Sequence, residues 1–180
     1  MTDAIELSPA DPNWPAAFTV ARASILPCFH KPPLLIEHMG STAIPGLPAK
    51  PIIDMIVLVE DLQQGHAAAV ALEVAGFVYR ADYADTTKLL FMKRDAGDGR
   101  RTHHLHVHED ADEVSRHLIF RDALRDDDTL RDAYRDLKQA LALRFRDDRM
   151  AYSRYKTAFV DQVVRDHGGP ARRVHWDPLQ

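Results

Sequence analysis

The sequence predicts an α/β domain with a mixed sheet of about five strands, an N-terminal helix and a helical C-terminal third. Apolar segments of strand length lie between residues 34 and 108, where turn residues separate them. From residue 110 to about residue 167 the apolar positions instead follow helical spacing. With 180 residues, 46% of them hydrophobic, the chain has the size of one globular domain. We expect a single domain over residues 1–180, with its core at about residues 14–165 and a loose tail at 168–180.

The first expected element is a helix over residues 14–28. Residues 11–13, Asp-Pro-Asn, offer capping groups for its start, and the two prolines of residues 31–33 end it. One stripe of this helix is apolar and consists of Trp14, Phe18, Ala21 and Ile25. We expect this stripe to pack on the sheet.

Five strands are expected, at residues 34–39, 51–60, 77–80, 88–93 and 102–108. A turn or short helix at 41–50 joins the first two, and a helix capped by Asp61 and stopped at Gly76 leads to the third. The segment Asp-Ala-Gly-Asp-Gly-Arg at 95–100 is the strongest turn signal in the chain. It predicts that the last two strands form a hairpin.

The C-terminal third predicts three amphipathic helices. Their apolar positions are Val114, Leu118, Ala123 and Leu124 in the first, Leu130, Ala133, Tyr134, Leu137 and Leu141 in the second, and Tyr152, Tyr155, Phe159 and Val163 in the third. Residues 126–129, Asp-Asp-Asp-Thr, are interpreted as a capping cluster rather than a metal site, because negative charge favours a helix start.

Composition narrows the class of partner. The formal net charge of −4 and the pI of about 6.2 argue against a protein that coats nucleic acid. The single cysteine, Cys28, cannot form an internal disulfide and is expected in the core. The N-terminus does not resemble a signal peptide, and the apolar runs are too short to cross a bilayer. We expect a soluble, cytoplasmic protein with neither a membrane nor a nucleic acid as partner.

Asp54 is the most informative residue, because its strand is otherwise apolar. Ile52, Ile56 and Leu58 share its face, and the other face is wholly apolar, so both faces are expected to be covered. Burying an unpartnered carboxylate costs several kcal/mol. Asp54 should therefore have a cation, N–H donors or a ligand beside it.

Gly40 and Ser41 follow the first strand. Glycine allows a close approach of backbone to phosphate, and serine can donate to a phosphate oxygen. With Asp54 on the adjoining strand, this pair resembles the nucleotidyltransferase pattern of Gly-Ser followed by metal-binding carboxylates. That pattern has a second acid two residues on, where this chain has Ile56. Glu37 and His38 point to opposite faces, so one of them is expected to face the site.

Residues 103–109 read His-His-Leu-His-Val-His-Glu. In a strand, His104, His106 and His108 share one side, while Leu105 and Val107 face helices. Three interpretations stay open. One or two imidazoles could complete a metal site with Asp54, or the face could be polar with His104 or His106 hydrogen-bonded to Asp54. The third interpretation is a catalytic histidine, as in the histidine-triad nucleotide hydrolases.

Several segments together resemble the GrpB family. They are residues 37–54, His104-Leu-His-Val, Phe120-Arg-Asp-Ala-Leu-Arg, Tyr134 with Leu137-Lys138, and Asp148-Arg149 with Tyr152 and Lys156. The resemblance extends over about residues 14–159, with the segments in the expected order. It implies a nucleotidyltransferase-like fold, in a family that also lacks the second acid and whose members sometimes occur with dephospho-coenzyme A kinase.

The function predicted from the sequence is metal-assisted transfer of a nucleotidyl group from a nucleoside triphosphate to a small acceptor. Asp54 would be the catalytic residue and would hold magnesium, manganese or zinc together with His104 and His106. The expected phosphate ligands are Gly40, Ser41, Thr42, Lys50, Arg121, Lys138 and Lys156. For the cations, a surface turn at Lys50 and helix-surface ion pairs at the others are the alternatives. The competing functions are a non-catalytic nucleotide- or metal-binding module and a histidine-triad-like hydrolase.

Overall fold

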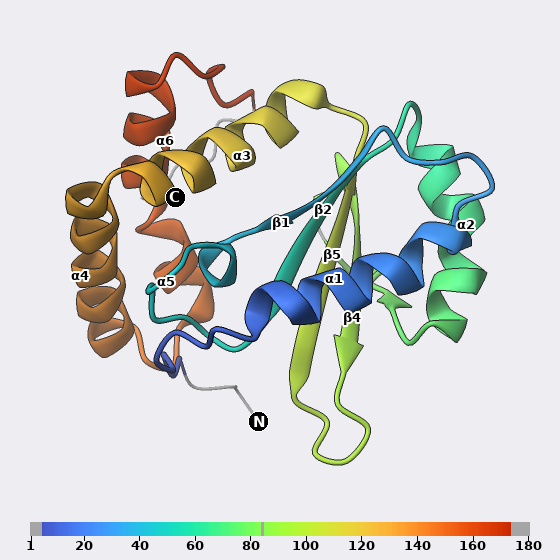
Figure 1. Cartoon of the computed structure of the whole chain (residues 1–180), viewed down its shortest axis with the longest axis horizontal. Helices are drawn as coiled ribbons and strands as arrows, with labels where there is room; N and C mark the ends of the chain where they lie inside the picture. The colour runs from blue at the N-terminus through green and yellow to red at the C-terminus, as the bar shows by residue number, and fades with distance from the viewer. Residues whose placement is uncertain (1–4, 84, 174–180) are drawn as a thin grey trace.

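The computed structural model describes residues 5–83 and 85–173, and Figure 1 shows the arrangement of its elements. Their bounds are α1 (Trp14–Ile25), η1 (Leu26–Cys28), β1 (Leu35–Met39), η2 (Ser41–Ala43), β2 (Ile53–Leu58), α2 (Leu62–Val74), β3 (Val78–Tyr79), β4 (Lys88–Arg94), β5 (Arg101–His108), α3 (Ala111–Asp126), α4 (Asp128–Arg144), α5 (Arg149–Arg154) and α6 (Thr157–Asp166).

The five strands form one mixed sheet in the order β1-β2-β5-β4-β3. Strands β2 and β5 are parallel, and the other three pairs are antiparallel. The predicted fold class is therefore confirmed, and so is the expectation that the Asp54 strand and the histidine strand are neighbours. The β4–β5 hairpin also forms as predicted and projects from the body of the molecule (Figure 1).

Helices cover both faces of the sheet (Figure 1). The main core lies where α1 and α2 pack on one face, and it includes Trp14, Ile25, Leu72, Phe91 and Leu105. On the other face, Val114 of α3 packs on Met39 and Ile56. Beyond the β1 edge, α4 and α6 pack on α3 around a second core that includes Phe120, Tyr134 and Val163.

Local differences from the expected elements have physical causes. The first helix ends at Ile25, and residues 26–28 form a 3₁₀ turn that contains Pro27, which cannot continue the α-helical hydrogen bonding. In place of the expected third C-terminal helix there are two helices, α5 and α6, and their apolar residues contribute to different clusters. Tyr152 packs with Leu141 and Ile5, whereas Val163 packs in the second core.

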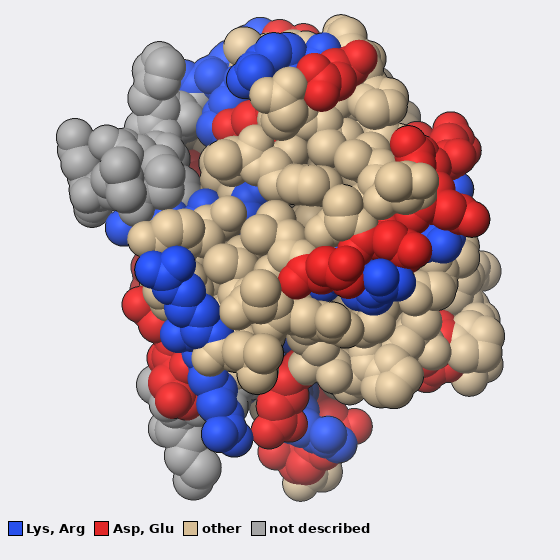
Figure 2. Space-filling view, turned by 90° about the vertical axis from the view of Figure 1, so that its left-hand side faces the viewer, with Lys and Arg blue, Asp and Glu red and all other residues tan. Residues whose placement is uncertain are grey.

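Charged side chains on α4 form a solvated face, as the sequence indicated. Arg131 pairs with Asp128 and Arg135 pairs with Asp132, each at 2.8 Å. On the side of the molecule that carries α4, acidic and basic residues lie next to one another in bands between uncharged surface (Figure 2). Asp127 caps α4 by accepting hydrogen bonds from the amides of Thr129 and Leu130, which confirms the capping interpretation.

The segment after α6 lies along the helices up to residue 173. Arg172 pairs with Asp161, and Arg116 donates to the carbonyl oxygen of Pro170. The rest of the expected loose tail, residues 174–180, lies outside the described residues. None of the described helices is both long and apolar enough to span a bilayer.

Candidate functional site

The sheet register brings the predicted site residues together. Asp54 lies opposite Met39 of β1 and next to His104 of β5, and residues paired in this way point to the same face. His106, two residues further on, shares that face. The Asp54 side chain keeps 30% of its surface exposed, so this face is covered by α3 only in part.

Asp54, His104 and His106 form a compact donor group. One potential ligand atom from each residue lies within 4.8 Å of those from the other two. His104 Nδ1 is 2.9 Å from Asp54 Oδ1, so the hydrogen bond that was one of the open interpretations is present. His104 Nε2 is buried and has no hydrogen-bond partner. Burial lowers the pKa of His106 well below its ordinary value, so this imidazole is neutral at pH 7. The group can accept a divalent cation.

Gly40 lies directly against this donor group. Its backbone has φ 71° and ψ −170°, a conformation that essentially only glycine adopts. A Cβ atom at this position would be 2.7 Å from Asp54 Oδ2. The Ser41 side chain interacts with the Tyr134 phenol, whose pKa is raised by burial. Glycine is therefore required both for the turn and for the position of the Asp54 carboxylate.

Three lysines that were predicted to bind phosphate lie together beside this turn, although they come from different parts of the chain. Lys50 and Lys156 lie over the Tyr152 ring, with Nζ at 5.4 and 4.3 Å from its centroid. Lys138 Nζ lies 5.5 Å from the centroid of Tyr134 and donates to the carbonyl oxygen of Pro48 at 2.5 Å. These side chains define the lysine–tyrosine cluster, which consists of Lys50, Lys138, Lys156, Tyr134 and Tyr152.

The positive charge of this cluster depends on Lys138 at neutral pH. Lys138 is only 2% exposed, and burial, followed by the charge of Lys156, lowers its pKa to about 7, although Asp54 opposes the shift. Burial raises the pKa of Tyr152 to about 12, so its phenol is uncharged. A bound anion would stabilise the charged form of Lys138. The cluster therefore has the chemistry of a polyanion site.

Two residues predicted as phosphate ligands have protein partners instead. The Thr42 hydroxyl donates to the Ile52 carbonyl oxygen and contacts His38 Nε2, both at 3.0 Å. Arg121 is buried and donates to Glu37 at 2.7 Å and to the carbonyl oxygen of His38 at 2.8 Å. In these positions, both residues hold the turn after β1.

The residues expected to flank the site divide between the two faces. His38 stacks on Phe18 of α1, with centroids 4.9 Å apart, and burial lowers its pKa to about 4. Glu37 lies on the Asp54 face, where Arg121 binds it. Cys28 is half-buried beside the main core, and burial raises the pKa of its thiol.

Sequence reasoning missed the roles of Tyr134 and Arg125. Arg125 Nε donates to the carbonyl oxygen of Ala43 at 2.9 Å. A signal for Tyr134 was present, because Tyr134 and Lys138 are four residues apart and so lie on one face of a helix. Tyr152 and Lys156 repeat this spacing. For Arg125, nothing in the local sequence indicated a backbone partner.

Comparisons with known proteins agree on one family. The model of the GrpB protein family matches residues 4–166. A UPF0157 protein of Pseudomonas aeruginosa is 39% identical over 163 residues, which are 90% of this chain and 67% of that protein. A UPF0157 protein of Streptomyces coelicolor is 34% identical over 170 residues, 94% and 87% of the two chains.

Longer proteins and a solved structure also match. A dephospho-CoA kinase of Mycobacterium tuberculosis is 33% identical over an alignment of 201 residues that covers 96% of this chain and 48% of that protein. The chain thus spans about half the length of this relative. The crystal structure of the conserved protein GrpB from Enterococcus faecalis superposes with a TM-score of 0.79 at 30% identity, covering 90% of this chain and 96% of the other.

A matched pair of substitutions tests the role of Gly40. Gly40→Ala should reduce the free energy of unfolding by about 2–4 kcal/mol, because it adds strained backbone and a clash with Asp54. Gly46→Ala should reduce the free energy of unfolding by only about 1 kcal/mol. Its φ is also positive, at 76°, so the backbone strain is similar, but its Cβ would meet nothing within 4 Å. Urea unfolding measures both. Equal losses would contradict the contact between Gly40 and Asp54.

Proposed function

Because the chain belongs to the GrpB protein family, we propose that it is a metal-assisted nucleotidyltransferase that uses a nucleoside triphosphate and a small acceptor. The observation that carries this proposal is the contact between the Gly40-Ser41 turn and the Asp54–His104–His106 group. It puts a turn suited to phosphate beside donors suited to a divalent cation. The name of the mycobacterial relative, dephospho-CoA kinase, is compatible with nucleotide-related chemistry.

The donor set fits a borderline divalent cation. One carboxylate with two imidazoles suits zinc or manganese better than magnesium, which prefers oxygen ligands. His104 Nδ1 lies 2.9 Å from Asp54 Oδ1, so a cation held by both residues would take the place of the hydrogen bond between these two atoms. When bound, the cation would supply charge to polarise phosphoryl oxygens.

The triphosphate would lie along the turn and the lysine–tyrosine cluster. Gly40 allows the backbone to approach a phosphate, and Ser41 can donate a hydrogen bond to it. Lys50, Lys138 and Lys156 supply positive charge next to this turn. An anionic oxygen of the acceptor would attack the α-phosphorus as the bond from that phosphorus to the bridging oxygen breaks. Pyrophosphate would leave, with its charge neutralised by the lysines.

A non-catalytic nucleotide- or metal-binding module is the second candidate, because Ile56 occupies the position of the second acid. Ile56 is fully buried between Met39 and Val114, so no carboxylate replaces the missing one at that point of the strand. A site with less negative charge holds fewer cations and stabilises the transition state less. A histidine-triad-like hydrolase has less support, since His104 is bound to Asp54 and its other nitrogen is buried.

Metal binding is the first test. Calorimetric titration with zinc or manganese should give one site, which Asp54→Ala abolishes and His106→Ala weakens, because each removes a ligand. His103→Ala is the matched control: His103 lies on the same strand but on the opposite face and should leave the affinity unchanged. If zinc, manganese and magnesium all fail to bind even with nucleotide present, the proposal of a metal site is wrong.

Triphosphate binding and turnover form the second test. A nucleoside triphosphate at a hundredfold excess over its Kd should stabilise the protein by about 2.7 kcal/mol, seen as a higher Tm. Ser41→Ala should reduce this shift, and Lys156→Met should reduce it further. Release of pyrophosphate with an acceptor panel would support the transferase, whereas binding without turnover would favour the module. If no nucleotide raises the Tm, both the transferase and the nucleotide-binding module are wrong.

The pH dependence of triphosphate affinity tests Lys138. A lysine with a pKa of about 7 is charged below pH 7 and neutral above it, so the affinity should fall between pH 6 and 8 in the absence of metal. Lys138→Met should bind more weakly and show a flatter profile, which separates this effect from the titration of the phosphate itself. Identical pH profiles for the two proteins would contradict the proposed role of Lys138.

A further inference from the structure

Two arginines of α3 hold the carbonyl groups on either side of the Gly40-Ser41 turn. Arg121 donates to the carbonyl oxygen of His38 at 2.8 Å, and Arg125 donates to that of Ala43 at 2.9 Å. The two arginines are four residues apart, so both project from the same side of the helix. The turn is therefore held at both ends by one rigid element.

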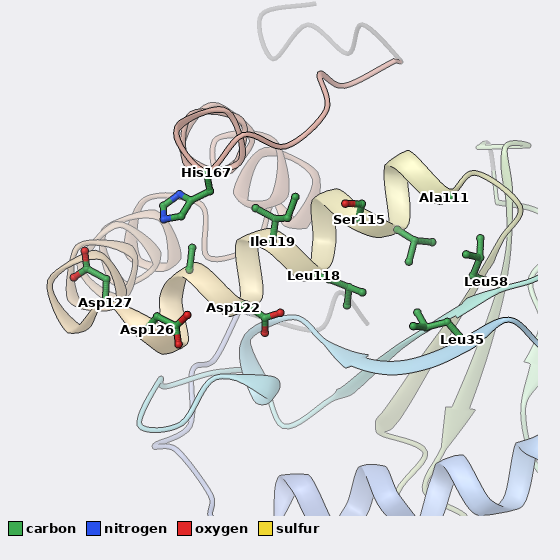
Figure 3. Close-up of a pocket in the computed structure, with 12 residues that line it drawn as sticks. Leu35, Leu58, Ala111, Ser115, Leu118, Ile119, Asp122, Asp126, Asp127 and His167 are labelled. Carbon is green, nitrogen blue, oxygen red and sulfur yellow. The ribbon is translucent and has the colours of Figure 1, made fainter.

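Asp122 links the two arginines. Its Oδ1 accepts from Arg121 Nε at 2.7 Å and from Arg125 Nη1 at 3.2 Å, and its Oδ2 accepts from Arg121 Nη2 at 3.0 Å. The carboxylate is half-exposed and points from α3 towards the end of β1, at the edge of a groove of about 560 Å³ (Figure 3). Burial raises its pKa, but the hydrogen bond and charge of Arg121 outweigh this effect and lower it, so Asp122 is ionised at neutral pH.

We infer that Asp122 is a positioning residue for the phosphate-binding turn, acting through Arg121 and Arg125. A long guanidinium side chain loses rotamer entropy when it holds one carbonyl, and a carboxylate that fixes the guanidinium plane reduces that cost. This inference rests on the proposed function for its connection to phosphate. The coupling of Asp122 to the turn itself rests on the hydrogen bonds alone.

The two arginines should depend on Asp122 to different degrees. Arg121 is only 9% exposed and also binds Glu37, so a second carboxylate still orients it when Asp122 is neutralised. The Arg125 side chain is 36% exposed, and among the described residues it donates to the carbonyl oxygen of Ala43 and to the Asp122 carboxylate. Loss of the Asp122 charge should therefore loosen the Ala43 side of the turn more than the His38 side.

The experiment combines amide exchange with two binding measurements on the full chain. Asp122→Asn should speed exchange at Ala43 and Ile44 about tenfold, because their amides donate within this turn to Gly40 and Ser41. It should weaken triphosphate binding about tenfold while the zinc or manganese affinity stays within about twofold. Arg125→Gln should give the same changes, and the double variant should add little to them.

The control is Asp132→Asn, which neutralises a comparable Asp–Arg pair on α4. It should change neither exchange at the turn nor triphosphate affinity. Unchanged exchange at Ala43 and Ile44 in Asp122→Asn would overturn the inference, and so would an equal acceleration throughout β2 and β5, which indicates general destabilisation. If the unaltered protein binds no triphosphate, the proposed function fails, and the exchange data still decide whether Asp122 positions the turn.

Discussion

The site depends on hydrogen bonds from three cationic side chains to backbone carbonyls at the end of β1 and in the β1–β2 connection. Arg121, Arg125 and Lys138 donate to the carbonyl oxygens of His38, Ala43 and Pro48. A hydrogen bond from a charged donor contributes about 1.5–3 kcal/mol, and leaving a buried carbonyl unpaired costs a similar amount. The connection contains prolines and glycines and has few backbone hydrogen bonds of its own. Side chains of the C-terminal helices therefore supply the hydrogen bonds to its carbonyls that a helix or strand would form within its own backbone.

This arrangement ties the C-terminal helices to the sheet at the point where chemistry is proposed. Ile44 and Leu47 of the same connection pack among Phe120, Leu124 and Tyr134, so apolar burial and the charged hydrogen bonds act on the same segment. Asp54 is in turn fixed by the parallel pairing of β2 and β5 and by the close approach of Gly40. A loss of helix packing would therefore disturb the turn before it disturbed the sheet.

The electrostatics divide the site into two chemically different halves. On the sheet, a carboxylate and two imidazoles offer lone pairs to a cation. In the lysine–tyrosine cluster, three lysines with two tyrosines offer positive charge to an anion. The low pKa of Lys138 follows from its burial first and from the nearby charge of Lys156 second. A metal bound to a polyphosphate would satisfy both halves at once, which is why their proximity favours nucleotide chemistry over either ligand alone.

Much of the fold was determined by the sequence. The apolar segments predicted the strands, the turn at 95–100 predicted the hairpin, and the spacing in the C-terminal third predicted the helical region. These features are predictable because local sterics and burial patterns depend on residues that are close in the sequence. The unusual chemistry of Asp54, Gly40-Ser41 and the histidine strand was likewise visible in the sequence, since a carboxylate in an apolar strand requires a partner.

Tertiary structure decided what each long polar side chain binds. Arg121 and Arg125 reach backbone carbonyls more than eighty residues away in the chain, Thr42 turns inward to Ile52, and Tyr134 meets Ser41. A flexible side chain on a helix can reach many partners, and only the packing of α3 and α4 against the sheet selects one of them.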